Sequence, residues 1–169
     1  HLWRLGGRFT NVPQAIKDIK GGLLQEKEAE NGAYYCSLPS FIDEYRLIRR
    51  MGERIGQPVY LMLCTLTDGK GNPLDSGEKL LKMSEQLKEA IRMSLRKGDT
   101  YTQYSPNQLL VLLIGANEEN IELIAERITK NFSADHKYWK NGVDYYVTAA
   151  IDPQDEARNI ILRRRSNIK

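Results

Sequence analysis

The sequence predicts an α+β fold, a ferredoxin-like βαββαβ sandwich preceded by one extra helix. Residues 59–67 and 109–114 are apolar runs of the kind found in strands buried on both faces. Residues 77–96 and 118–132 repeat apolar side chains at helical spacing. A proline and an asparagine separate the Thr- and Tyr-rich residues 99–104 from the second apolar run, which favours a tight hairpin turn. We therefore expect helices packed against one face of a four-stranded antiparallel sheet.

Caps and chain breakers set the other elements. Residues 13–20 predict a short helix with Asn11 as its cap. The extra helix is expected to begin at Ser40, which makes a capping-box-like start with Asp43. Ser76 is the expected N-cap of the helix at 77–96, and Asn117 is the expected N-cap of the helix at 118–132. The last strand is expected at residues 143–151.

Composition divides the chain into three segments. Residues 1–38 contain two glycine pairs and a charged stretch, and they predict a linker from a missing upstream domain. Residues 39–152 carry all the elements of the predicted sandwich. Residues 153–169 include three consecutive arginines and predict a basic C-terminal tail at the surface.

Charge, cysteine spacing and the length of apolar runs argue against a nucleic-acid-binding protein, a cysteine metal site and a membrane span. The 169 residues carry a net charge of +3, too little to indicate nucleic-acid binding by itself. Arginines populate the outer faces of the helix that begins at Ser40, but Glu44 and Glu53 lie among them, so a solvated surface is the favoured interpretation. Cys36 and Cys64 have no metal-ligand or CxxC spacing, and no apolar run is long enough to span a membrane. These features predict a cytoplasmic protein without a metal site.

The hairpin resembles that of the GGDEF diguanylate cyclases, which have a nucleotide-cyclase-type palm fold. Those proteins read approximately R-x-x-D, five residues, G-G-D-E-F and an apolar strand. Here Arg96 and Asp99 occupy the first motif, and five residues then lead to the signature turn. The signature turn consists of Ser105, Pro106, Asn107, Gln108 and Leu109.

The resemblance also shows what has been lost. In the family, carboxylates from the signature turn and from the end of the first strand hold divalent ions that act on the triphosphate. Asn107 and Gln108 are amides, and Thr65 and Thr67 stand where the strand's aspartates are expected. Asp68 lies one residue further on, where alternation turns it to the other side. The departures imply no catalytic residue, no metal, no cofactor and no enzyme activity.

One motif of the family is retained. In diguanylate cyclases an R-x-x-D element at this spacing forms an inhibitory site for cyclic di-GMP, so Arg96 and Asp99 are candidate ligand-binding residues. The alternative is structural, because an arginine near a helix end and an aspartate at a strand start also make a stabilising pair.

A broader resemblance covers roughly residues 12–151. Residues 19–36, 41–68 and 96–128 are similar to the C-terminal portion of SARP-type bacterial transcription regulators, in which a winged helix and a bacterial transcriptional activator domain come first. This implies a non-catalytic regulatory domain that senses, dimerises or binds a partner. A homodimer is expected, with DNA contacted only through upstream domains, since no recognition helix is found here. The alternatives are a nucleotide sensor that uses Arg96 and Asp99 and, more remotely, an active nucleotide cyclase.

Overall fold

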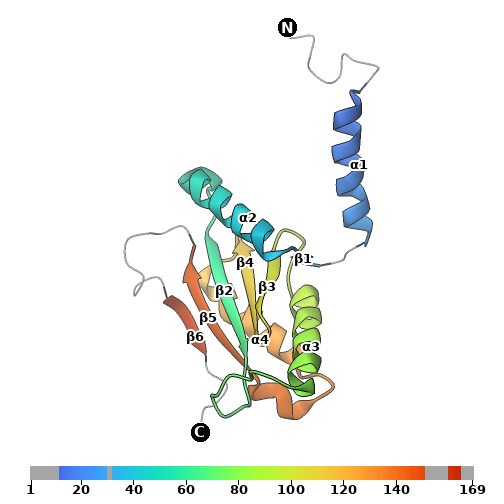
Figure 1. The fold of residues 1–169 in the computed structure, drawn as a ribbon. Coiled ribbons are helices and arrows are strands. Elements are labelled where there is room, and N and C mark those ends of the chain that lie inside the picture. The colour runs from blue at the N-terminus through green and yellow to red at the C-terminus, as the bar shows by residue number, and fades with distance from the viewer. Residues whose placement is uncertain (1–11, 30–31, 151–159, 165–169) are drawn as a thin grey trace. The chain divides into compact units, whose positions relative to one another are not determined.

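The computed structural model describes residues 12–29, 32–150 and 160–164 (Figure 1). The chain divides into two compact units, His1–Asn31 and Gly32–Lys169. The described residues of the first unit form the helix α1 (Gln14–Ala29), which is longer than the expected helix at 13–20. The cap predicted at Asn11 lies outside the described residues. No helix in the described ranges has the length and apolarity needed to cross a membrane.

The second unit is built on one mixed sheet with the strand order β1-β3-β4-β2-β5-β6. The four strands of the predicted sandwich are antiparallel neighbours in its middle. Two further strands extend its edges: β1 pairs with β3 in parallel, and β6 pairs with β5. The strands are β1 (Tyr34–Tyr35), β2 (Val59–Leu66), β3 (Thr100–Ser105), β4 (Gln108–Ile114), β5 (Val143–Ala149) and β6 (Ile160–Arg164). The predicted ferredoxin-like core is therefore confirmed, in a wider sheet.

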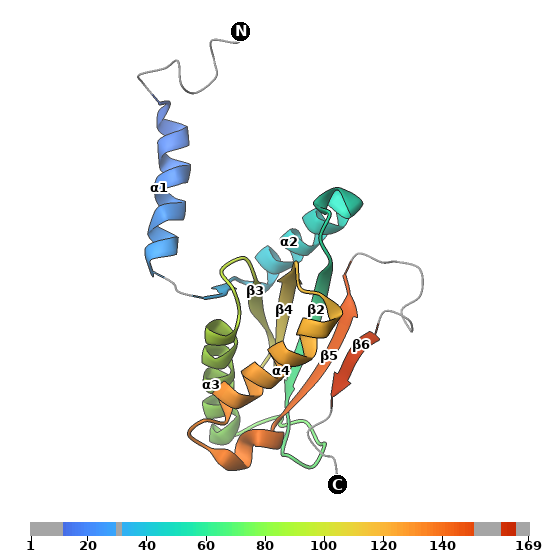
Figure 2. The ribbon, with the colours of Figure 1, turned by 180° about the vertical axis from the view of Figure 1, so that it is seen from behind.

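Helices cover both faces of this sheet, not one as expected. They are α2 (Leu38–Met51), η3 (Gly52–Ile55), α3 (Glu78–Ser94), α4 (Glu118–Phe132) and η4 (Lys137–Asn141). The main core joins α3 and α4 to alternate residues of β2, among them Met62 and Cys64. A smaller core joins Phe41 and Ile48 of α2 to Val59, on the opposite side of the same strand. Accordingly, α4 lies behind the sheet in Figure 1 and in front of it in Figure 2, whereas α2 does the reverse.

The ends of the helices correct two predicted caps. Ser37, not Ser40, caps α2, and its hydroxyl accepts the Ser40 N–H at 3.4 Å. The N-cap of α3 is Gly77, which offers no side-chain hydrogen bond, instead of Ser76. The prediction for α4 is confirmed, because Asn117 Oδ1 accepts the Asn120 N–H at 2.9 Å.

The segments expected to flank the domain contribute to its sheet. Tyr34 donates its N–H to Asp99 O at 3.0 Å, and Cys36 donates to Tyr101 O at 3.0 Å, so the boundary expected after residue 38 falls inside the folded unit. Residues 160–164, which belong to the expected tail, pair with β5. Edge pairing of this kind depends on backbone groups that composition does not reveal.

Candidate functional site

The signature turn joins β3 to β4 and is held by neutral polar side chains. Ser105 Oγ lies 2.8 Å from Asn107 Oδ1 and 3.1 Å from Gln108 Oε1. Gln108 stands opposite Thr65 in the β2–β4 register, and its Nε2 donates to Thr65 Oγ1 at 3.3 Å. The two amides of the turn and the threonine of the first strand thus come together, as the family resemblance implies, and they hydrogen-bond to one another.

The side-chain amide of Gln103, in β3, also holds the turn. The Gln103 Nε2 group donates to the backbone oxygen of Ser105 at 2.5 Å and to that of Gln108 at 3.3 Å. Ser84 of α3 donates to Gln103 Oε1 at 3.4 Å. The β3–β4 register shifts between Gln103 and Ser105, which is the irregularity that these bonds span. The turn is therefore closed by hydrogen bonds among uncharged groups.

The end of β2 supplies no carboxylate to this turn. Thr67 is buried, donates from Oγ1 to Asn141 O at 3.3 Å and accepts the Gly69 N–H at 3.2 Å. Asp68 is exposed, and its carboxylate accepts the Lys70 N–H at 2.7 Å, which with further hydrogen bonds from Asn72 lowers the pKa of Asp68. Among the described residues, no three His, Cys, Asp or Glu side chains gather as metal ligands do.

The two cysteines are placed as structural thiols. Cys36 packs in the smaller core, and burial raises its pKa to about 11. Cys64 is fully buried in β2, and burial raises its pKa as well. A thiol that stays protonated is a poor nucleophile, so neither residue suits covalent chemistry.

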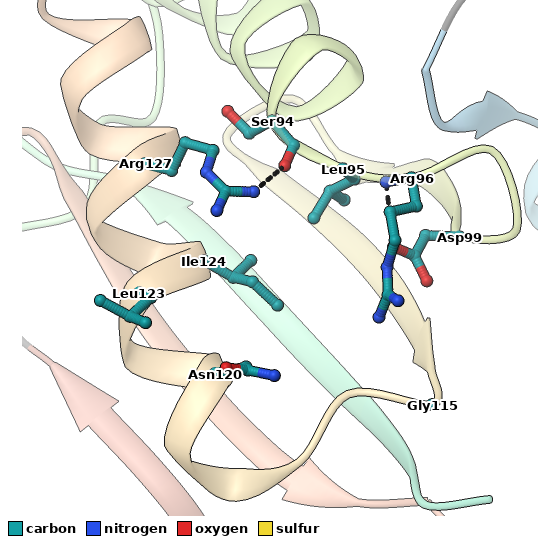
Figure 3. A pocket seen from close by; sticks show the side chains of 9 residues that line it. All are labelled: Ser94, Leu95, Arg96, Asp99, Gly115, Asn120, Leu123, Ile124 and Arg127. Atoms are coloured by element: carbon teal, nitrogen blue, oxygen red, sulfur yellow. Dashed lines mark hydrogen bonds between the residues drawn. The ribbon is translucent and has the colours of Figure 1, made fainter.

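The R-x-x-D residues line a pocket of about 280 Å³ between the end of α3, the end of β4 and α4 (Figure 3). Its walls are Ser94, Leu95, Arg96, Asp99, Gly115, Asn120, Leu123, Ile124 and Arg127. The Arg96 side chain is exposed and projects toward the pocket in Figure 3. The structure therefore brings both sequence candidates to one concave site.

Asp99 is, however, engaged with the backbone. It is 3% exposed, its Oδ2 accepts the Arg96 N–H and its Oδ1 accepts the Ile114 N–H, each at 3.2 Å. Burial raises the pKa of Asp99, and the two N–H groups together with the Arg96 charge oppose that shift. The carboxylate thus ties the turn after α3 to the end of β4, which is the structural role considered from sequence.

Sequence reasoning missed a second arginine at this pocket. Arg127 of α4 donates from Nη1 to Ser94 O at 3.1 Å (Figure 3). Arg96 and Arg127 are 31 positions apart in the chain, and the packing of α4 against α3 brings them to one pocket. The sequence shows Arg127 only as a cation near a helix end, so no local signal identifies it.

Comparison with known proteins gives a likeness of fold. No family model matches the sequence, and no curated protein does. A diguanylate cyclase (DGC) protein from Thermotoga maritima is similar over 69% of this chain and 79% of that chain, with 15% identity and a TM-score of 0.52. The diguanylate cyclase SiaD from Pseudomonas aeruginosa, solved in complex with its activator SiaC, matches 86% of this chain and 58% of that chain, with 12% identity and a TM-score of 0.57. The FimX GGDEF domain from the same organism matches 76% of this chain and 83% of that chain, with 12% identity and a TM-score of 0.50.

These comparisons support the GGDEF-like, cyclase-type fold expected from the hairpin. At 12–15% identity they carry no residue roles from one protein to another. The chemistry of this chain therefore rests on its own side chains.

Proposed function

We propose that this chain is a catalytically silent, cyclase-fold regulatory domain of a bacterial DNA-binding transcriptional activator. The observation that supports silence is the signature turn, where Asn107 and Gln108 bond to Ser105 and Thr65. A two-metal reaction on a nucleoside triphosphate needs anionic oxygens that bind and orient the ions. Neutral amide and hydroxyl groups that hydrogen-bond to one another offer no anionic ligand set.

The test is an assay for cyclic dinucleotide with the purified chain, GTP and Mg²⁺. We expect no product above a protein-free control, while an active diguanylate cyclase assayed in parallel gives a full signal. Cyclic di-GMP formed at a rate proportional to the concentration of this protein would overturn the proposal.

The regulatory context rests on the resemblance to SARP-type regulators. In this proposal DNA is bound by upstream domains, and the cyclase-fold domain contributes self-association or contact with a partner protein. The SiaD structure, which holds an activator protein, supports the capacity of this fold to take a protein partner. The reading frame of the intact gene tests the context: a winged helix upstream is the expected result, and a receiver or membrane sensor there would contradict it.

Self-association of the chain into a homodimer can be tested by measuring its mass in solution. A regulator that binds palindromic or repeated sites gains from a homodimer. Light scattering across a concentration series is expected to show a mass that rises from one chain toward two. A single-chain mass at all concentrations would remove self-association and leave contact with a partner protein and nucleotide binding as the non-catalytic roles.

A second candidate function is nucleotide binding in the pocket of Arg96 and Arg127. The observation that favours it is the placement of two guanidinium groups around one cavity of about 280 Å³. Guanidinium groups form paired, charge-assisted hydrogen bonds with phosphate oxygens. In this candidate the arginines bind a phosphate of a nucleotide such as cyclic di-GMP, and Asp99 shapes the wall through its two backbone bonds.

Calorimetry with cyclic di-GMP tests the second candidate. Removing a charged hydrogen-bond partner costs about 1.5–3 kcal/mol, so Arg96→Ala should weaken binding roughly 10- to 100-fold. Arg54→Ala, at an exposed arginine outside the pocket, should leave the affinity unchanged. Absence of binding by the unaltered chain at high micromolar concentration would remove this candidate.

A further inference from the structure

The last residue of α3 receives two hydrogen bonds from α4. Ser94 is 3% exposed, and its carbonyl is one of the helix-end acceptors that have no partner within the helix. Arg127 Nη1 donates to that carbonyl at 3.1 Å, and Asn131 Nδ2 donates to Ser94 Oγ at 2.8 Å. Ser94 Oγ in turn donates to Ala90 O at 2.5 Å. Two side chains one turn apart on α4 therefore hold the end of α3.

Arg127 belongs to this cap and to the pocket at once. A guanidinium has five N–H donors in a rigid plane, and the bond to Ser94 uses Nη1. That bond restrains the Arg127 side chain at the end of α3, where it also lines the pocket, and it leaves the other N–H donors of the group for a ligand. Asn131 does not line the pocket, and its described hydrogen bond goes to Ser94 alone.

We infer that Asn131, acting through Ser94, is a positioning residue that pre-orients the Arg127 guanidinium, so that anion binding in the pocket and capping of α3 reinforce each other. This inference rests on the second candidate function, nucleotide binding at Arg96 and Arg127. An anion held by Arg127 joins α4 to the end of α3, because the same guanidinium still holds the Ser94 carbonyl. Ligand binding therefore slows the opening of the last turn of α3.

Two substitutions separate positioning from simple stabilisation. Asn131→Ala removes one hydrogen bond and leaves the pocket walls intact, so it should weaken cyclic di-GMP binding by roughly 3- to 10-fold. Asn131→Asp cannot donate to Ser94 Oγ, and it places a carboxylate four residues after Arg127, which draws the guanidinium away from the pocket. The loss of affinity should therefore be greater for Asn131→Asp than for Asn131→Ala. Asn141→Ala is the matched control, because Asn141 is exposed and its described role uses only its backbone oxygen.

Calorimetry and hydrogen exchange on the whole chain, with cyclic di-GMP as the probe, complete the test. In the unaltered protein the ligand should slow amide exchange at residues 92–97, and Asn131→Ala should reduce that slowing. Arg127→Lys keeps the charge without the planar group, and it should lose the ligand-dependent protection even if the Asn131 variants fold poorly. If the unaltered chain does not bind the probe, the second candidate function and this inference both fail. If it binds, but the Asn131 variants bind equally well with equal protection, only the inference fails.

Discussion

Replacing Asp99 by asparagine tests the structural role of the buried carboxylate in the pocket. Each carboxylate oxygen accepts one backbone N–H, from Arg96 and from Ile114, at 3.2 Å. Asparagine has one acceptor oxygen, so its NH₂ group must face one of those N–H groups. A buried donor left without an acceptor costs about 1–3 kcal/mol. Removal of a desolvated charge offsets part of this cost, and we expect Asp99→Asn to lose about 1–2 kcal/mol at pH 7.

The pH dependence of this loss has a defined sign. Burial raises the pKa of Asp99, so the folded chain holds the proton more tightly than the unfolded chain does. The protonated carboxyl therefore contributes stability that is fully present below the unfolded pKa of about 3.9. That stability is lost as the pH rises through the raised folded pKa. Asparagine has no such contribution, so the deficit of the Asp99→Asn variant should grow as the pH is lowered from 7 toward 4.

Urea unfolding followed by circular dichroism, at several pH values, measures both effects. Asp135→Asn, at an exposed carboxylate, is the control and should change stability little at any pH. An Asp99→Asn variant as stable as the unaltered protein at pH 7 would refute the hydrogen-bond argument. A deficit that shrinks on acidification would refute the assigned direction of the pKa shift.

Two further predictions concern local backbone geometry. Ser37→Ala should cost about 0.5–1 kcal/mol because it removes the cap of α2, whereas Ser40→Ala should cost less, as urea melts of the two variants can show. Gly32 has φ +90°, and a Cβ there would lie 2.0 Å from Arg92 O, so Gly32→Ala should lose roughly 2–4 kcal/mol. Gly98→Ala is its control, because a Cβ at Gly98 meets nothing within 4 Å; an equal loss at Gly98 would contradict the steric explanation.

Local patterns in the sequence account for the order of the core elements. The continuous apolar runs of β2 and β4 and the helical spacing of apolar residues in α3 and α4 predict the type of each element, because both signals come from residues close in the chain. The cap at Asn117 is local in the same sense, since its bond reaches only three residues ahead. The cap of α2 was missed because Ser37 and Ser40 are both suitable, and the backbone conformation decides between them.

The pairing of distant segments depends on how the whole chain packs. Edge strands β1 and β6 join the sheet through backbone groups that carry no side-chain signature, so a linker and a tail were expected there. The candidate pocket likewise depends on the packing of segments that lie far apart in the chain. Arg96 and Asp99 were found from their spacing, but Arg127 reaches them only because α4 packs beside α3.

The cyclase-like hairpin and the amides in place of its carboxylates can be recognised without a structure, since both are properties of contiguous residues. The structure decided what those amides do: Gln108 turns across the sheet to Thr65, and the turn closes on itself. The structure also shows that the Asp99 carboxylate accepts hydrogen bonds from two backbone N–H groups, and that two arginines line the pocket. The physical reason is that hydrogen-bond partners and buried charges are fixed by residues brought together through packing, which one-dimensional spacing does not specify.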